Sequence, residues 1–285
     1  MTIKHQYKMK FTKMHGIGND YIYINGFEEQ IDNPTDFAIR YSDRHNGIGS
    51  DGLVLILPST YCDFRMRMFN ADGSESEMCG NASRCIGKYV YDKGLTDKTD
   101  LTLETLAGVK KLKLFLGDDN LVEIVTVDMG EPILESSRIP TTIRQHNIVN
   151  ESVIFSPSIK HRITCVSMGN PHTVIFTKDI HKLNLPKTGS LIENADIFPR
   201  RTNVEFIEVI SPDRMKMRVW ERGSGETLAC GTGACAAAVA GVLNGFSSRK
   251  STVELLGGEL VIEWNAFDNH VYLTGGATTV FEGEI

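Results

Sequence analysis

The sequence predicts a two-domain α/β protein in which one fold occurs twice. The chain has 285 residues, and a typical domain has about 150. A Cys-Gly pair occurs at Cys79-Gly80 and again, 151 residues later, at Cys230-Gly231. In both halves a helix-like stretch follows this pair, and three short strand-like runs separated by turn residues follow the helix. These observations predict an α+β class for each domain.

The repeat keeps a constant offset along the chain. Asn170 lies 151 residues after Asn19, and the segment Phe64–Asn70 falls on Met215–Glu221 at the same shift. Repetition at one long period indicates two copies of a domain rather than a solenoid of many short units. We therefore expect two pseudo-symmetric domains.

The domain boundary is expected near Gly130, where a Gly-Glu-Pro turn separates the two series of strands. Residues 1–128 form the predicted first domain, which carries Cys79, and residues 129–275 form the second, which carries Cys230. Residues 276–285 follow the last strand of the second domain, and we expect them to return to the first.

Each element of the first half has a local reason. Tyr21–Ile24 is aromatic and β-branched, and Phe64–Phe69 alternates apolar with basic residues, so both are predicted strands. Apolar residues recur near 3.6-residue spacing from Cys79 to Tyr91, which predicts a helix that stops before Gly94. A glycine-rich turn is expected at residues 15–20, a short helix at 36–44, and further strands at 53–57, 101–106, 109–116 and 121–127.

The second half repeats this order. Small residues from Cys230 to Asn244 predict a helix that Gly245 ends. A polar connection containing Pro186 and Pro199 is expected at residues 177–202. Strands are expected at residues 162–167, 173–176, 203–210, 214–220, 252–256, 259–264 and 271–274, with a hairpin turn at Gly257-Gly258.

Composition argues against several classes of protein. Apolar residues make up 41% of the chain and charged residues 23%, and no segment approaches the roughly 20 apolar residues of a membrane span. The net charge of −6, without a basic run, argues against a nucleic-acid surface. Residues 1–10 are polar and lack the apolar core of a secretory signal, so a cytoplasmic protein is expected.

The six cysteines are too sparse for a disulfide scaffold. Cys62, Cys85, Cys165 and Cys235 are expected to be small buried residues. The cysteines lack the short spacing of zinc ligands, and the glycine-rich segments match neither the dinucleotide-binding nor the P-loop pattern. We therefore expect no metal and no nucleotide cofactor.

Cys79 and Cys230 differ from the other cysteines because each lies at a predicted helix start beside a glycine. The helix dipole and the unpaired amides at such a start favour a thiolate, so each cysteine is a candidate acid or base. The segments Gly80-Asn81 and Gly231-Thr232 leave backbone donors for an anion.

Two such helices could bind one carboxylate and present a thiol to each face of its α-carbon. A thiolate would remove the α-proton while the second thiol delivers a proton to the opposite face, which inverts the centre. The developing enediolate needs prearranged donors, each typically worth about 3–4 kcal/mol. The two thiols should titrate as a coupled pair. This chemistry is that of an amino-acid racemase or epimerase.

At these residues the chain resembles the diaminopimelate epimerases over most of its length. Each motif alone is weak, but together they are specific to that family. The motifs are Lys13–Asp20, Asn70–Glu75, Cys79-Gly80-Asn81, Gly169–His172, Asn203-Val204-Glu205, and Glu221-Arg222-Gly223 through Cys230–Gly233.

The resemblance implies two domains, each a mostly antiparallel β-sheet or barrel wrapped around a central helix, in a protein that usually forms a homodimer. It implies conversion of LL-2,6-diaminopimelate to the meso isomer for lysine and peptidoglycan synthesis, without pyridoxal phosphate or a metal. In the family pattern Cys79 is the base toward the L centre and Cys230 is its partner, an order that the residues alone leave open.

The resemblance also assigns roles to further residues. Glu221 and His172 would hold the reacting ammonium group and support the thiols. An arginine suits bidentate carboxylate binding, and asparagine amides offer both donors and acceptors. The residues that would bind the α-carboxylate are Gly80, Asn81, Gly231 and Thr232, and those that would read the distal amino-acid group are Asn19, Asn70, Asn170, Asn203 and Arg222.

Two departures from the family pattern concern substrate fit. Ala82-Ser83 stands where many members have Gly-Ala, which adds bulk in the first helical turn. Gly52 stands where some members have Gln, which removes a potential ligand contact.

Three alternative functions follow from the same residues. A cofactor-independent racemase of another amino acid, such as histidine, is the nearest, although a one-ended substrate would not need Arg222 together with the asparagines. A thiol-disulfide redox protein would normally pair its cysteines in a C-x-x-C motif. A non-catalytic amino-acid binding protein would need no paired thiols.

Overall fold

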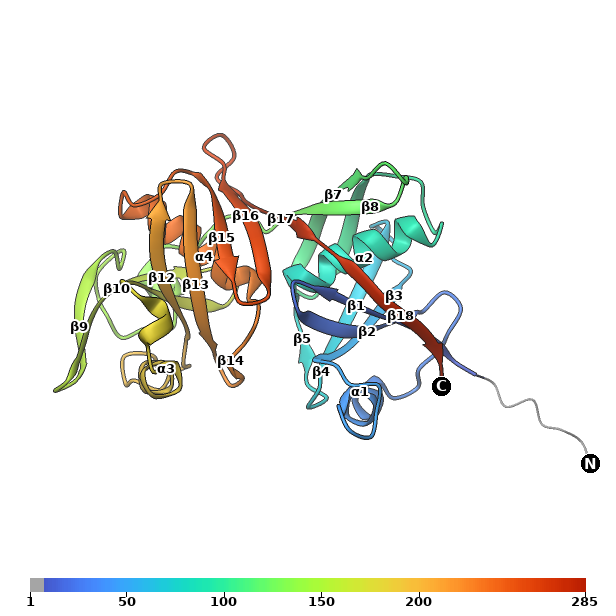
Figure 1. Cartoon of the computed structure of the whole chain (residues 1–285), viewed down its shortest axis with the longest axis horizontal. Coiled ribbons are helices and arrows are strands. Elements are labelled where there is room, and N and C mark those ends of the chain that lie inside the picture. Colours follow the sequence, from blue (N-terminus) through green and yellow to red (C-terminus); the bar gives the residue numbers. More distant parts are fainter. Residues whose placement is uncertain (1–7) are drawn as a thin grey trace, which may run out of the picture. The chain divides into compact units, whose positions relative to one another are not determined.

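The structure, a computed structural model, describes residues 8–285, and the chain divides into two compact units. Unit 1 runs up to Val125 and includes Gly276–Ile285, and unit 2 is Thr126–Gly275 (Figure 1). The division falls within strand β8, Val122–Asp128, and at the end of strand β17, Val271–Gly276.

Unit 1 combines antiparallel strand pairs with two parallel pairings. Strands β1 and β2, β3 and β4, β6 and β7, and β1 and β18 are antiparallel, whereas β2 pairs in parallel with β3 and β4 with β6. A parallel pairing needs a crossover, and helices α1 and α2 supply the two crossovers. The elements are β1 Lys10–Gly16, β2 Asn19–Asn25, α1 Pro34–Ser42, β3 Gly52–Leu57, β4 Phe64–Asn70, β5 Glu75–Ser76, α2 Gly80–Asp92, β6 Asp100–Thr105, β7 Gly108–Leu116 and β18 Thr278–Glu284.

Unit 2 has the same pairing scheme. Strand β11 pairs in parallel with β12 and β13 with β15, and the remaining neighbours are antiparallel. The elements are 3₁₀ turn η1 Ser136–Arg138, β9 Glu151–Ser156, β10 Ile159–Ser167, β11 Pro171–Phe176, 3₁₀ turn η2 Ile180–Lys182, α3 Leu185–Glu193, β12 Asn203–Ser211, β13 Arg214–Glu221, β14 Gly225–Glu226, α4 Gly231–Leu243, β15 Lys250–Leu255 and β16 Gly258–Trp264.

The 151-residue repeat extends to individual side chains. Asn33 caps α1 by accepting from the amide of Asp36, and Asn184 caps α3 by accepting from the amide of Lys187, each at 3.2 Å. Both helices also carry proline in the first turn, where no amide donor is needed.

A second repeated contact closes each Gly-containing hairpin before the cysteine. Arg67 Nε lies 2.7 Å from Glu75 Oε1, and Arg218 Nε lies 2.8 Å from Glu226 Oε1. The equivalent ion pairs place β5 and β14 in the same register against β4 and β13. The two units are therefore pseudo-symmetric at the level of side chains.

A largely buried helix stands at the centre of each unit. Ten of the thirteen residues of α2 and ten of the thirteen residues of α4 are buried. Helix α4 is apolar all round because it consists mainly of alanine and glycine, as a helix enclosed by strands requires. It contacts β10, β11, β12, β15 and β16. The predicted fold class, strands wrapped around a central helix in each half, is confirmed.

Within residues 8–285, no helix is both long and apolar enough to cross a membrane.

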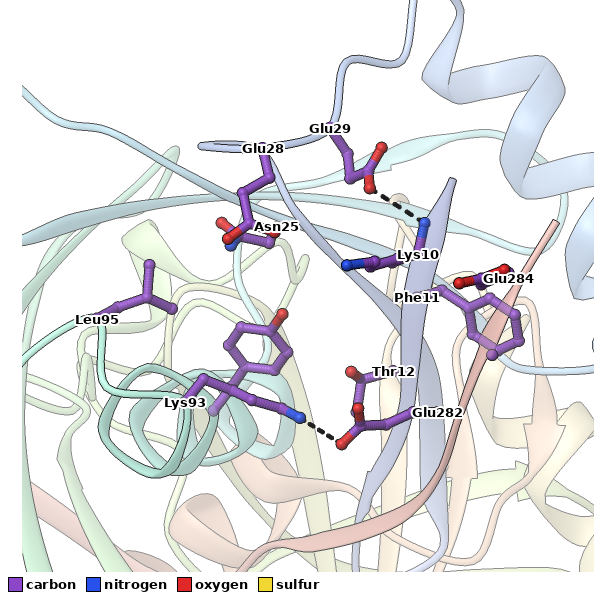
Figure 2. A pocket seen from close by; sticks show the side chains of 12 residues that line it. Lys10, Phe11, Thr12, Asn25, Glu28, Glu29, Lys93, Leu95, Glu282 and Glu284 are labelled. Carbon is purple, nitrogen blue, oxygen red and sulfur yellow. Dashed lines mark hydrogen bonds and ion pairs between the residues drawn. The ribbon is translucent and has the colours of Figure 1, made fainter. Parts of the chain in front are cut away.

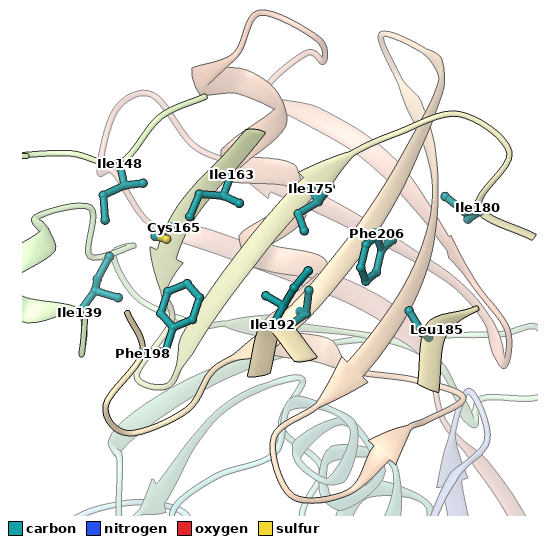
Figure 3. Close-up of a cluster of buried hydrophobic side chains, with 11 residues drawn as sticks. Ile139, Ile148, Ile163, Cys165, Ile175, Ile180, Leu185, Ile192, Phe198 and Phe206 are labelled. Carbon is teal, nitrogen blue, oxygen red and sulfur yellow. The ribbon is translucent and has the colours of Figure 1, made fainter. Parts of the chain in front are cut away.

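Residues 177–202 hold η2 and α3, so the predicted polar connection is wrong. Pro186 lies in the first turn of α3, where proline is tolerated, and does not interrupt the helix. Leu185 and Ile192 of α3 join a buried cluster with Ile175 and Phe206 of the sheet (Figure 3). The apolar face of α3 therefore covers the outer side of the sheet of unit 2.

Three smaller expectations are also corrected. Strand β1 continues to Gly16 and β2 begins at Asn19, so the turn predicted at 15–20 shrinks to Ile17-Gly18. Leu255 pairs with Gly258, so the hairpin turns at Leu256-Gly257. Strands β9 and β18 were not predicted because neither alternates apolar and polar residues in the way of a half-buried strand.

Candidate functional site

Both candidate cysteines occupy the N-cap position of a central helix. Cys79 and Cys230 have extended backbones, with φ of −140° and −126°, and α2 and α4 begin at the next residue. The first intrahelical bonds run from Ser83 N to Cys79 O and from Ala234 N to Cys230 O. The amides of the intervening residues therefore precede the helical ladder and can donate to an anion, as a carboxylate site requires.

In unit 1, an asparagine amide links Cys79 to the start of its helix. The thiol of Cys79 donates to Asn19 Oδ1 at 3.4 Å, and Asn81 Nδ2 donates to the same oxygen at 3.2 Å. Asn19 Nδ2 donates to Asp51 Oδ2 at 2.8 Å, which fixes the amide with its oxygen toward the helix. Fully buried Arg84 donates to Asn81 Oδ1 at 2.9 Å and so orients the second amide. We call Cys79, Asn19, Asn81 and Asp51 the first half-site.

Charged groups surround Asp51 at this half-site. Burial, reinforced by neighbouring Asp20, raises the pKa of Asp51. Burial opposes ionisation of Asp20 as well, but hydrogen bonds from Arg44 and Lys13 prevail and lower the pKa of Asp20. Lys13 Nζ lies 2.7 Å from Asp20 Oδ2 and is almost fully buried. The carboxylate that orients Asn19 is thus part of a mixed-charge cluster.

In unit 2, Cys230 is more deeply buried than Cys79, with an exposed fraction of 5%. Its sulfur accepts from the amide of Gly233 at 3.3 Å and lies 3.6 Å from Thr232 Oγ1. Asn170 Nδ2 donates to the same hydroxyl at 3.3 Å. Asn170 and Thr232 lie 151 residues after Asn19 and Asn81, so the same two positions contact each other in both halves.

His172 reaches this second half-site through Asn170. Its ring is fully buried on β11, with Nδ1 2.6 Å from Glu205 Oε1 and Nε2 2.9 Å from Asn170 Oδ1. Both ring nitrogens therefore have protein partners in this arrangement. His172 is thereby linked to the Cys230 sulfur through Asn170 and Thr232. We call Cys230, Thr232, Asn170, His172 and Glu205 the second half-site.

Glu221 adds a carboxylate beside Cys230. Burial raises the pKa of Glu221 despite hydrogen bonds from Thr227 and Cys230 that lower it. Burial likewise raises the pKa of Cys230 well above its usual value, and the charges of Glu221 and Glu205 act in the same direction. Hydrogen bonds from Thr232 and Gly233 oppose this shift. The Cys230 proton thus has a carboxylate acceptor next to it, and the thiolate has two donors.

The predicted readers of the distal group lie in different settings. Asn203 is 4% exposed, and its Oδ1 accepts from the amide of Arg222 at 2.8 Å while its Nδ2 donates to Pro171 O at 2.9 Å. Asn203 therefore fixes the backbone that carries Arg222. Arg222 Nη1 donates to Arg200 O at 3.2 Å.

Asn70 ends β4 in unit 1, and its amide donates to Ser74 Oγ at 3.0 Å. It lies at the position equivalent to Glu221 in the repeat. The two units therefore differ here by an amide in one and a carboxylate in the other.

The two departures from the family pattern have structural explanations. Ser83 is fully buried, and its hydroxyl donates to Cys79 O at 2.9 Å, so the added polar group is directed at the helix backbone. A Cβ at Gly52 would lie 2.0 Å from the carbonyl oxygen of Phe69. A side chain at position 52 would therefore require the backbone of this structure to shift.

A pocket of about 500 Å³ lies elsewhere in unit 1, at the C-terminal end of α2. Figure 2 shows its charged lining, in which Lys93 pairs with Glu282 and the amide of Lys10 donates to Glu29. None of its lining residues belongs to either half-site. This pocket is therefore not the candidate site.

Sequence reasoning missed three charged residues at or beside the half-sites, namely the buried Glu205 and Arg84 and the partly exposed Asp51. Glu205 lies within the mostly apolar run 204–207 of β12, and Arg84 lies among the buried residues of α2. A charged residue on a core-facing position is rarely buried without a partner. That irregularity was the available signal for Glu205 and Arg84, whereas Asp51 lies in a glycine-rich loop where carboxylates are common.

Comparison with known proteins places this chain in a family. A sequence model described as diaminopimelate epimerase matches residues 11–135 and 164–280. Diaminopimelate epimerases of Methanococcus maripaludis strain C6 and of Desulfovibrio desulfuricans are 58% and 60% identical to the chain. The alignments cover 97% of this chain and 99% and 98% of the relatives.

Solved structures with low sequence identity share the fold. A hydroxyproline epimerase from Agrobacterium vitis has a TM-score of 0.71 at 15% identity and covers 99% of this chain and 94% of its own. A phenazine biosynthesis protein of the PhzF family from Bacillus anthracis has a TM-score of 0.70 at 16% identity and covers 98% and 99%. With the pseudo-symmetric cysteine caps and close full-length relatives, this chain is an epimerase that belongs to the diaminopimelate epimerase family.

Proposed function

We propose that the protein converts LL-2,6-diaminopimelate to the meso isomer with Cys79 and Cys230 as its two acid/base groups and without an organic cofactor or metal. The observation that carries this proposal is the pair of thiols, each at the N-cap of a buried helix at equivalent positions of a repeat. Relatives of 58% and 60% identity that are diaminopimelate epimerases support the substrate.

The reaction consists of two proton transfers. One cysteine, as thiolate, removes the α-proton, and the electron pair of the C–H bond passes to the carboxylate as an enediolate. The other cysteine, as thiol, gives its proton to the opposite face of the carbon. The two sulfurs have then exchanged protonation states, so the reverse reaction uses the same groups in the opposite order.

Backbone amides stabilise the negative charge that develops in this step. The amides of Gly80 and Asn81 in α2, and of Gly231 and Thr232 in α4, precede the helical ladder and serve the α-carboxylate. A prearranged donor of this kind is typically worth about 3–4 kcal/mol in the transition state. This term allows a weakly acidic α-proton to be removed by a thiolate.

Glu221 and Arg222 bind the two ends of the substrate in this proposal. Glu221 accepts from the reacting ammonium group, and Arg222 forms a bidentate pair with the distal carboxylate. Asn203 supports Arg222 through its backbone amide. Asn19, Asn70 and Asn170 provide the mixed donors and acceptors that a zwitterion needs.

The family pattern also suggests an oligomeric state, a cellular location and a pathway for the enzyme. We infer that it acts as a homodimer in the cytoplasm and supplies meso-diaminopimelate for lysine and peptidoglycan synthesis. Sedimentation of the purified protein at micromolar concentration should give twice the chain mass, and a single-chain mass contradicts the dimer.

The substrate is tested by incubating the purified, reduced protein with LL-diaminopimelate in D2O and following the α-proton by NMR. We expect loss of the α-proton signal and appearance of the meso isomer. Histidine and other single amino acids are the comparison substrates. Exchange of one of these without exchange of diaminopimelate would reassign the protein to another racemase.

The two-base scheme is tested by Cys79→Ala and Cys230→Ala. Each variant lacks one of the two proton-transfer groups, so we expect each to lose epimerisation. Cys62→Ala is the matched control, because that thiol lies outside both half-sites and should be dispensable. Substantial turnover by either of the first two variants contradicts the scheme.

A further inference from the structure

Glu205 is a buried carboxylate that the reaction scheme does not use. It lies on β12 with no exposed surface, and its Oε1 is 2.6 Å from His172 Nδ1. Its other oxygen, Oε2, has no hydrogen-bond partner within residues 8–285. Burying a carboxylate costs free energy unless the group is paired or hydrogen-bonded, so its hydrogen-bond partner, His172, is the place to look for its role.

A chain of hydrogen bonds connects Glu205 to the sulfur of Cys230. It runs from His172 Nε2 to Asn170 Oδ1 over 2.9 Å, and from Asn170 Nδ2 to Thr232 Oγ1 over 3.3 Å. Thr232 Oγ1 then lies 3.6 Å from Cys230 Sγ. Every link is within unit 2.

The amide of Asn170 gives this chain a direction. Its Oδ1 can only accept, so His172 Nε2 must donate, and its Nδ2 can only donate, so Thr232 Oγ1 must accept. The single hydrogen of the Thr232 hydroxyl is then free to point at Cys230. The carboxylate of Glu205 lies at the other ring nitrogen, Nδ1, and holds the ring with Nε2 toward Asn170.

In the first half-site the hydrogen bonds of the equivalent asparagine run in the opposite direction. Asn19 donates through Nδ2 to Asp51 and presents Oδ1 to Cys79, whose thiol donates to it. Tyr21 and Val54 stand at the positions equivalent to His172 and Glu205, so unit 1 has no counterpart of this pair. The equivalent asparagines therefore act in opposite ways. Asn19 accepts a hydrogen bond from the thiol of Cys79, whereas Asn170 donates one to Thr232, which can donate in turn to Cys230.

We propose that Glu205 is a positioning residue that, through His172, Asn170 and Thr232, directs a hydrogen-bond donor at the sulfur of Cys230 and so makes the two half-sites chemically unlike. The role of these hydrogen bonds in catalysis rests on the proposed function, but their effect on the pKa of the Cys230 thiol does not. The titratable groups that bear on Cys230 are Glu221 on β13, Glu205 on β12 and His172 on β11.

The substitution Glu205→Gln distinguishes action through the hydrogen-bond chain from a direct effect of the Glu205 charge on Cys230. If Glu205 acted on Cys230 only as a nearby negative charge, its removal would favour the thiolate. If it acts through the chain, the amide, which can accept from or donate to Nδ1, no longer fixes which ring nitrogen carries the hydrogen. A ring with its hydrogen on Nδ1 lets Asn170 turn over, and the thiolate then loses its Thr232 donor. The two explanations therefore predict shifts of opposite sign.

The assay is the rate of Cys230 alkylation by iodoacetamide as a function of pH, followed by peptide mass spectrometry in the full-length protein. We expect the pH–rate curve of Glu205→Gln to move up by about one pH unit, a tenfold loss of thiolate at a given pH. Glu208→Gln is the matched control, because Glu208 lies on the same strand and accepts from Ile180 N. A curve that is unchanged or moves down overturns the proposal.

A double-mutant cycle tests the route. In the Thr232→Val background the donor to Cys230 is absent, so Glu205→Gln should cause no further upward shift. An equal upward shift in both backgrounds contradicts action through Thr232.

A spectroscopic measurement keeps the proposal testable even if Glu205→Gln is poorly folded. Long-range ¹H–¹⁵N spectra of the wild-type protein should show a hydrogen on Nε2 of His172, which is the donor that the hydrogen-bond chain requires. A ring that carries its hydrogen only on Nδ1 overturns the proposal. Neither this spectrum nor the alkylation assay depends on turnover of diaminopimelate, so failure of the substrate proposal leaves both results interpretable.

Discussion

Gly233 in the first turn of α4 has no room for a side chain, and Gly233→Ala should therefore impair the second half-site. A Cβ there would lie 2.8 Å from Glu205 Oε1 and 3.1 Å from Cys230 Sγ. Ordinary contact begins at 3.4 Å, so the carboxylate must withdraw by about 0.6 Å and the sulfur by about 0.3 Å. The same movement misaligns the 2.6 Å contact between Glu205 and His172.

The expected effect on stability is small because two terms oppose each other. Overpacking typically costs about 1–3 kcal/mol, and replacing a helical glycine by alanine returns up to about 1 kcal/mol. The effect on catalysis is larger, since misplacing a reacting group by 1 Å can cost about 100-fold. We expect kcat to fall about 10- to 100-fold while the free energy of unfolding falls by no more than about 2 kcal/mol.

Gly87→Ala is the matched control for this substitution. Gly87 is a buried helical glycine of α2, and its added Cβ would meet the end of the flexible Leu114 side chain at 2.8 Å. The leucine can move without disturbing a thiol, so kcat should stay near the wild-type value. Steady-state epimerisation and urea unfolding measure both quantities. Wild-type kcat in Gly233→Ala would refute the reasoning.

Three further predictions concern stability, acid sensitivity and substrate affinity. Asn33→Ala and Asn184→Ala each remove a helix N-cap and should lower the free energy of unfolding by about 1 kcal/mol in urea titrations, with similar values because the caps are equivalent; no loss in either contradicts the capping role. Burial opposes ionisation of Asp63, but hydrogen bonds from a lysine and a threonine hold its pKa at about 2, below the usual value of 3.8. The stability it contributes is therefore present above pH 4 and lost as the pH falls toward 2, and Asp63→Asn should flatten acid unfolding curves in that window; an unchanged slope contradicts it. Arg222→Lys keeps the charge but not the bidentate geometry, so KM should rise about tenfold or more with a smaller change in kcat; an unchanged KM excludes Arg222 as the reader of the distal carboxylate.

The repeat offset contains information about the fold that local patterns lack. Helix α3 was missed because Pro186 and Pro199 suggested a polar connection. Yet α1, shifted by 151 residues, falls on Leu185–Glu193, the observed bounds of α3. Gly189 is required because a Cβ there would lie 2.6 Å from the Trp220 side chain. Packing against β13, which local propensity does not contain, explains this glycine within a helix.

The helix caps of the candidate site were predictable from the sequence, but its hydrogen bonds were not. The Cys-Gly repeat identified both helix caps, because the chemistry of a helix start follows from local sequence. The opposite orientation of Asn19 and Asn170 did not follow, since it depends on Asp51 in one unit and His172 in the other. Residues distant in sequence decide which atom of each amide faces the thiol.

The central claim, that two thiols act as separate bases on one carbon, is tested most directly by isotope content early in the reaction. LL-diaminopimelate is incubated with the reduced enzyme in D2O, and product and remaining substrate are analysed at less than about one tenth conversion. Because the proton delivered comes from a thiol that has exchanged with solvent, each meso product should carry deuterium at the inverted centre, while recovered substrate should remain largely unlabelled. Meso product that retains the original proton would show that one group both removes and returns it, and would contradict the two-thiol account.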